Sequence, residues 1–241
     1  MKTRRLAVAG AAAPAILAAA ALAQPIALYE NTFEGLQAAG KEWSANTVLD
    51  THASFTRFAG RKSSESIRLK LDPTRGQRDD IPDDDGDGGG DGDGGGGGGS
   101  PYIAGLVTFD LYIIDSWDGS SSVHGPDTFE VLINREVHFS ETFTNLPDGT
   151  QTFRAPDAGP MHLGYHAQWM DSIYLGVEVP FVLPADANEL LIDFRGVGLQ
   201  GMIDESWGID NVRVTIEHVP APGAIGAFGL AGVFAARRRR R

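Results

Sequence analysis

The chain has 241 residues, no cysteine and a formal net charge of −12. Disulfides, thiolate metal sites and cysteine nucleophiles are therefore excluded, and the fold must depend on core burial, to which a bound metal would add. Eight basic residues lie at the two ends, which leaves 12 basic against 32 acidic residues in between, a net charge of −20. So acidic a middle repels nucleic acid and anionic lipid and attracts divalent cations.

Residues 1–23 have the organisation of a secretory signal peptide. A basic start is followed by an apolar run from Leu6 to Leu22, and the small residues Ala21 and Ala23 form a cleavage site before Gln24. The alternative, an uncleaved membrane anchor, is less consistent with an alanine-rich run that a proline interrupts. We expect export from the cytoplasm and processing by signal peptidase.

Residues 24–218 form the body of the chain, and their pattern predicts strands. Short runs rich in Val, Ile, Phe, Tyr and Thr alternate with Gly, Pro, Asn and Asp. Along this part of the chain Leu190, Ile192 and Phe194 alternate with Leu191, Asp193 and Arg195, which gives one apolar face and one solvent-exposed face. The expected strands, in chain order, are Ile26–Tyr29, Ser54–Phe58, Ser66–Leu71, Leu106–Ile114, Thr128–Ile133, Val137–Phe143, Thr150–Arg154, Ser172–Val179, Glu189–Arg195 and Ile209–Ile216. The prediction is an all-β, two-sheet antiparallel β-sandwich (jelly roll), flanked by the signal peptide and a C-terminal short apolar helix.

An insert of almost pure Asp and Gly, residues 79–100, interrupts this pattern. It holds eight Asp and eleven Gly, so it cannot bury enough apolar surface to offset the entropy of ordering, and a disordered loop is expected. Calcium binding is the alternative, because Asp83, Asp85, Asp87 and Gly88 match the start of an EF-hand loop. Position 94, where an EF-hand needs Glu, is Gly.

Two short acidic segments are the candidate metal ligands. Asp115, Asp118 and Asp127 follow an expected strand, and Asp204, Glu205 and Asp210 lead into the last one. Loops at strand ends can bring carboxylates together on Ca²⁺, which prefers six to eight oxygen ligands. The alternative for each residue is a turn residue that caps its own backbone.

Tryptophans and histidines are the remaining candidates. Trp117 and Trp169 lie in loop-like sequence and are the candidate sugar-stacking residues, although large aromatics in a sandwich also serve as core. His162 and His166 lack the Glu of a zincin pattern, and no nucleophile elbow or phosphate loop is present. We therefore expect a non-enzymatic protein; paired carboxylates of a glycan hydrolase stay open, because sequence does not give their separation.

The body also resembles jelly-roll carbohydrate-binding modules of the galactose-binding-domain-like superfamily. The residues that carry the resemblance are Asn31, Phe33, Glu34 and Trp43 near the start and Asp210 at the entry to the closing strand. The resemblance implies that Glu34 and Asp210 hold a structural calcium ion. Two carboxylates on adjacent first and last strands would repel each other without a cation.

Residues 219–241 resemble a PEP-CTERM sorting signal. Pro220, Ala221 and Pro222 precede a Gly/Ala-rich apolar stretch and the arginine cluster Arg237 to Arg241. The resemblance implies bacterial origin, transient anchoring in the inner membrane, cleavage by an exosortase-like enzyme and a place in the envelope or extracellular matrix. The usual Glu between the prolines is Ala221 here, which puts processing by the usual enzyme in question.

Together these features predict an exported, non-enzymatic envelope or matrix protein, stabilised by calcium and able to bind polysaccharide. A purely structural matrix protein without a soluble ligand is the first alternative. A secreted glycan hydrolase is the second.

Overall fold

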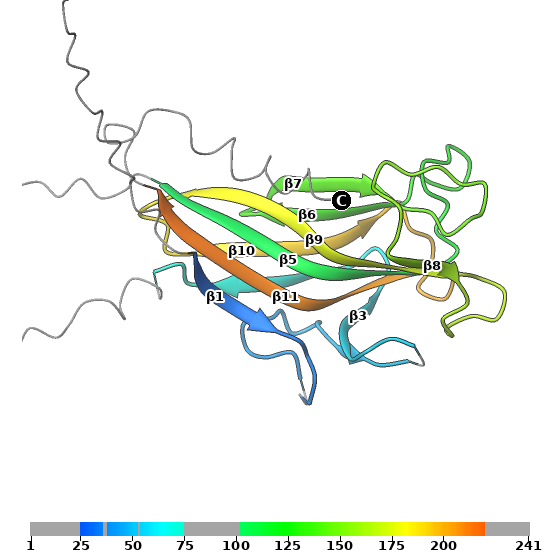
Figure 1. Cartoon of the computed structure of the whole chain (residues 1–241), viewed down its shortest axis with the longest axis horizontal. Coiled ribbons are helices and arrows are strands. Elements are labelled where there is room, and N and C mark those ends of the chain that lie inside the picture. Colours follow the sequence, from blue (N-terminus) through cyan, green and yellow to red (C-terminus); the bar gives the residue numbers. More distant parts are fainter. Residues whose placement is uncertain (1–24, 36–37, 53, 75–101, 220–241) are drawn as a thin grey trace, which may run out of the picture.

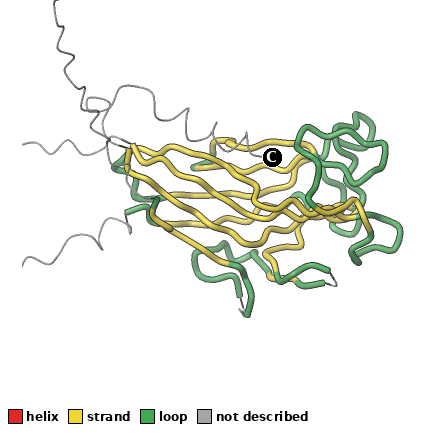
Figure 2. The backbone as a smooth tube through the Cα atoms, in the orientation of Figure 1, coloured by secondary structure: helices red, strands yellow, loops and turns green. Residues whose placement is uncertain are grey.

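The computed structural model describes residues 25–35, 38–52, 54–74 and 102–219. The expected signal peptide, the Asp/Gly insert with its EF-hand-like start, and the sorting segment lie outside these residues. Within the described part, all regular structure is strand (Figure 2). No helix there has the length and apolarity needed to cross a membrane.

Two antiparallel sheets pack face to face, which confirms the predicted β-sandwich (Figure 1). The larger sheet has the order β2-β3-β11-β5-β9-β8, with β1 also paired to β11, and the smaller has the order β4-β10-β6-β7. The larger sheet contains β1 (Ile26–Asn31), β2 (Leu49–Asp50), β3 (Phe58–Lys62), β5 (Tyr102–Asp115), β8 (Ala158–Met161), β9 (Asp171–Pro184) and β11 (Glu205–Val219). The smaller contains β4 (Ser66–Leu71), β6 (Thr128–Ile133), β7 (Glu136–Thr142) and β10 (Leu190–Val197).

The long strand β11 organises the larger sheet. On one side it pairs with β5 along its whole length, from Glu205 opposite Asp115 to Val219 opposite Tyr102. Its other side is shared, because β3 pairs with its first half and β1 with its second half. The register shift in the pairing with β5 falls between Asp210 and Arg213, at this change of partner.

The core between the sheets consists of aromatic and branched side chains on the inward faces of the strands. Phe109 of β5 packs edge-on against Phe194 of β10 with ring centres 5.2 Å apart, and Phe129 of β6 packs against Trp207 of β11 at 5.0 Å. All four side chains are almost completely buried. Such contacts contribute beyond the area they bury, and they hold the two sheets in one relative position.

Two expected strands were wrong. In place of Ser54–Phe58, the strand begins at Phe58, because the Thr56 hydroxyl donates to Asp210 and Phe55 packs into a second apolar cluster with Phe58 and Tyr112. Thr150–Arg154 is irregular as well. There the Gln151 side chain accepts from the Thr144 amide and donates to the carbonyls of Phe153 and Arg154, so it takes the place of a neighbouring strand.

The two ends of the sandwich differ in what they carry. Ile26, Tyr102 and Val219 lie at one end, since Ile26 pairs near the end of β11 and Tyr102 pairs with Val219 itself. At the opposite end β11 begins with Glu205, and most of the longer loops gather there (Figures 1 and 2). Fifteen residues of β11 separate the two ends, about 45 Å at roughly 3.3 Å per residue.

Candidate cation site

Trp117 anchors the loop that follows β5. Its indole is fully buried, and its Nε1 donates to the carbonyl of Ser206 on β11, 2.9 Å away. The carbonyl of Trp117 accepts from the Asn145 amide at 3.0 Å, which ties this loop to the one after β7. Gly119 allows the close approach, because its φ is +68° and an added Cβ would lie 2.2 Å from the carbonyl oxygen of Thr150. The loop therefore has little freedom where it presents Asp118.

Two further carboxylates enter from strand ends. Asp127 directly precedes β6, and its Oδ2 accepts the amide of Asp118. Glu205 is the first residue of β11, and its Oε2 accepts the Gln200 amide at 2.6 Å. Both residues are completely buried, whereas Asp118 is partly exposed.

The three residues Asp118, Asp127 and Glu205 form what we call the acidic triad. One carboxylate oxygen from each can be chosen so that all three oxygens lie within 4.8 Å of one another. The second oxygens of the two buried residues, Asp127 Oδ1 and Glu205 Oε1, have no hydrogen-bond partner. Buried polar atoms are almost always paired, so the two unpaired carboxylate oxygens make this group a candidate cation site.

Electrostatics support the same conclusion. The pKa of Glu205 is raised to about 7 and that of Asp127 to about 6, mainly by burial and in part by neighbouring negative charges, Asp118 among them. Partial burial also raises the pKa of Asp118. A divalent cation would reverse these shifts, because it stabilises the ionised carboxylates. The donor set consists only of carboxylate oxygens, which suits a hard cation such as Ca²⁺.

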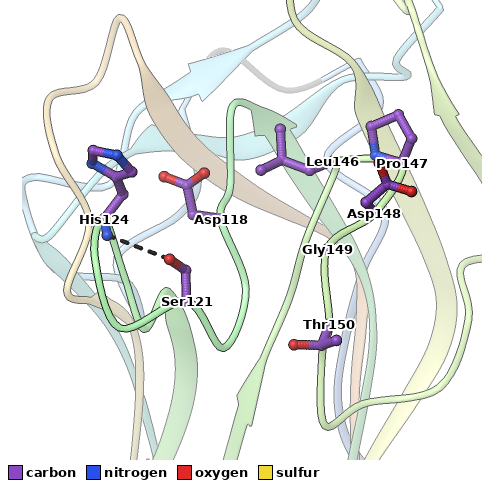
Figure 3. A pocket seen from close by; sticks show the side chains of 8 residues that line it. All are labelled: Asp118, Ser121, His124, Leu146, Pro147, Asp148, Gly149 and Thr150. Atoms are coloured by element: carbon purple, nitrogen blue, oxygen red, sulfur yellow. Dashed lines mark hydrogen bonds between the residues drawn. The ribbon is translucent and has the colours of Figure 1, made fainter.

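A cavity of about 450 Å³ lies beside the triad, with Asp118 in its wall (Figure 3). Polar and apolar groups share the wall, which includes Asp118, Ser121, His124, Leu146, Asp148 and Thr150. Ser121 Oγ accepts the amides of Val123 and His124, which fixes the turn on one side of the cavity. The volume falls within the range of small-molecule sites, roughly 300–1,000 Å³.

Of the seven predicted metal ligands, the structure brings Asp118, Asp127 and Glu205 together. Asp204 Oδ1 accepts from Ser116 Oγ at 2.7 Å. Asp115 lies next to them but is used differently: its Oδ2 accepts from Arg61 Nη2 at 2.5 Å. Glu34 is exposed and accepts the Arg57 amide. Asp210 is buried and accepts from Thr56 Oγ1 and Tyr112 Oη. Neither Glu34 nor Asp210 belongs to a group of potential metal ligands among the described residues.

The expectation for Trp117 as a sugar-stacking residue was wrong, because the side chain has no exposed surface. Its loop-like sequence was misleading, since the loop folds back over the end of the sandwich. Trp43 and Trp207 are buried as well. Trp169 is partly exposed, with its ring centre 6.3 Å from that of His166, and it does not line the cavity beside the triad.

Sequence reasoning missed the residues that surround Asp115. Arg61 is its ion-pair partner, and the Arg61 guanidinium also donates to Ser206 Oγ and stacks 4.6 Å above the ring of Tyr165. Asp171 is buried at the start of β9, where its Oδ1 accepts the amide of Asp115. The available signal for Asp171 was its place before a strand, which it shares with Asp127; nothing in the sequence marks Arg61.

Comparisons with known proteins identify no family. No family model matches the chain, and no curated protein matches it. Among solved structures, dimeric latent PorU from Porphyromonas gingivalis is similar at 11% identity and a TM-score of 0.40. The match covers 82% of this chain and 13% of that chain.

Proposed function

We propose that this chain is an exported envelope or matrix protein whose β-sandwich is stabilised by calcium bound at the acidic triad. The observation that carries the proposal is the pair of buried, unpartnered oxygens, Asp127 Oδ1 and Glu205 Oε1, beside the carboxylate of Asp118. Three buried or half-buried negative charges without a counter-ion would oppose folding, and calcium removes that cost.

A role outside the cytoplasm is supported by the sequence features of the two ends. Extracellular fluids supply calcium at concentrations that weak oxygen-ligand sites need, with dissociation constants of roughly 0.1–1 mM. A cysteine-free exported domain gains stability from such an ion where other proteins use disulfides. The signal peptide and the sorting segment are testable together: intact mass of the protein recovered from its native cells should lack residues 1–23 and the arginine-rich end. A full-length mass would contradict this assignment.

A non-enzymatic role is supported by the way the acidic residues are used. Among the carboxylates with raised pKa values at this end, Asp127, Asp171 and Glu205 each accept a backbone amide, and Asp115 accepts from Arg61. A structural role is further supported by the burial of Trp43, Trp117 and Trp207, since buried rings cannot stack on sugars. Polysaccharide recognition therefore needs a mechanism other than stacking on these rings.

The central test is thermal unfolding with calcium and with a chelator. At a calcium concentration of about 100 times Kd, binding to the folded state adds about 2.7 kcal/mol. For a domain of this size, that raises the midpoint by roughly 5–10 °C. Magnesium should act more weakly, because it demands a tighter octahedral geometry. An identical midpoint in calcium and in chelator would refute the proposed site.

A further inference from the structure

The triad leaves part of the coordination sphere of a bound ion open. Asp127 Oδ2 and Glu205 Oε2 already accept backbone amides, so the oxygens without any hydrogen bond are Asp127 Oδ1 and Glu205 Oε1. When these two oxygens and one or two from Asp118 hold the ion, the triad supplies three or four ligands, whereas Ca²⁺ takes about six to eight. At least two positions are left for water or for oxygen atoms of a ligand.

The open positions lie on the side of the cavity. Asp127 and Glu205 are fully buried, so a molecule from solvent reaches the ion past Asp118, the partly exposed member of the triad. Asp118 is also the member that lines the cavity, and Figure 3 shows its carboxylate between His124 and Leu146. A ligand in the cavity can therefore contact the ion and the polar residues of the wall at the same time.

The local charge selects the chemistry of that ligand. Three carboxylates and one Ca²⁺ leave a net charge of −1, and Asp148 in the cavity wall adds another negative charge. An anionic ligand would be repelled, whereas neutral hydroxyl groups bring oxygen atoms without charge. Two adjacent hydroxyls of a sugar ring can fill two neighbouring positions on one ion. Ser121, His124 and Thr150 offer hydrogen bonds to further hydroxyls.

We propose that the cavity beside the acidic triad binds a neutral sugar through two adjacent hydroxyls that coordinate the triad's calcium ion. This inference rests on the proposed calcium site and deepens it. It supplies a route to polysaccharide that needs no exposed tryptophan. The proposed sugar site lies at the Glu205 end of β11, about 45 Å along the strand from Val219 at the other end.

The first test counts the open positions directly. Tb³⁺ replaces Ca²⁺, and its luminescence lifetimes in H₂O and D₂O give the number of water molecules on the ion. We expect at least two, and we expect saturating methyl glycosides of glucose, galactose or mannose to remove two of them. Tetrahydropyran-2-methanol, a ring without adjacent hydroxyls, is the matched control and should remove none.

The second test uses thermodynamic reciprocity. A sugar that coordinates the ion must raise the apparent calcium affinity, about fivefold or more at saturation, by the same factor that calcium raises the sugar affinity. Thr150→Met extends a neutral side chain into the cavity and should abolish this coupling while calcium affinity stays within about twofold. Ser122→Met, on the neighbouring exposed loop and outside the cavity wall, should preserve both.

The outcomes separate the two proposals. If calcium does not bind, the proposed function fails. If calcium binds with fewer than two waters, or if none of the three glycosides changes the water count, only the sugar site fails. Tighter binding of glucuronate than of the neutral glycosides would overturn the assignment of a neutral ligand.

Discussion

Two buried acidic groups lie side by side at one end of the sandwich, and only one of them has a Lys or Arg ion-pair partner among the described residues. Asp115 and Asp171 share the cation Arg61, which the chain itself supplies. In the acidic triad, by contrast, no Lys or Arg of the described residues forms an ion pair with any member. Asp115 and Glu205 are direct register partners on β5 and β11, so the two groups are adjacent in the larger sheet. The comparison shows that the chain itself supplies a counter-charge to one buried acidic group, whereas the described residues supply no Lys or Arg partner to the other, where the proposed cation would act.

The largest expected effect comes from removing the internal cation. Arg61→Ala leaves Asp115 buried without a partner and should lower the free energy of unfolding by about 3–5 kcal/mol at neutral pH. The loss should be smaller near pH 5, because burial already raises the pKa of Asp115 to about 6 and the carboxyl can then be neutral. Denaturant unfolding at the two pH values measures this, with Arg61→Lys as the charge-preserving control. Equal losses at both values would mean that Arg61 acts by packing alone.

Neutralising a buried member of the triad should leave the free energy of unfolding unchanged or raise it when no calcium is present. Asp127→Asn and Glu205→Gln each remove a buried negative charge, so in chelator these variants should match or exceed the wild type by about 1 kcal/mol. In calcium both should lose most of the rise in midpoint. Asp186→Asn, an exposed acidic residue between β9 and β10, is the matched control and should behave like the wild type. Variants destabilised equally with and without calcium would show that these carboxylates act only through hydrogen bonds.

The pH dependence should distinguish the calcium-free from the calcium-bound protein. Because the pKa of Glu205 is about 7 and that of Asp127 about 6 when folded, the folded state retains protons that the unfolded state has already lost. With respect to these groups, stability in chelator is therefore fullest below about pH 4, where both states hold the protons, and falls as the pH rises from there through 7. Saturating calcium should flatten or invert this trend. Thermal midpoints at several pH values measure it, and parallel curves would contradict the expectation.

The smallest effect on stability is expected at the partly exposed member of the triad. Asp118→Asn keeps the shape of the residue and should change the free energy of unfolding in chelator by less than about 0.5 kcal/mol. Calcium affinity should nevertheless fall about tenfold or more, since a charged ligand is lost. Calorimetric titration measures the affinity. Unchanged affinity would place the ion away from Asp118.

Sequence patterns predicted the architecture and, among seven candidate ligands, the three residues of the acidic triad. Alternating runs such as Leu190 to Arg195 are sufficient to identify strands, because one face must be apolar wherever a sheet covers a core. Acidic residues at strand ends predicted Asp118, Asp127 and Glu205, since such loops gather at the ends of a sandwich. Sequence could not predict that Asp115 pairs with Arg61, because that contact joins residues 54 positions apart. Sequence also left open whether Trp117 is a core or an exposed residue, because that depends on the fold of a whole loop.

The course of β11 has a mechanical consequence. Glu205 of the triad begins this strand and Val219 ends it. A pull on the chain beyond Val219, with the triad end of the domain held in place, would act along the strand axis. The hydrogen bonds to β5 and β1 run perpendicular to that axis, so they would resist the pull together and the strand would not peel off one bond at a time.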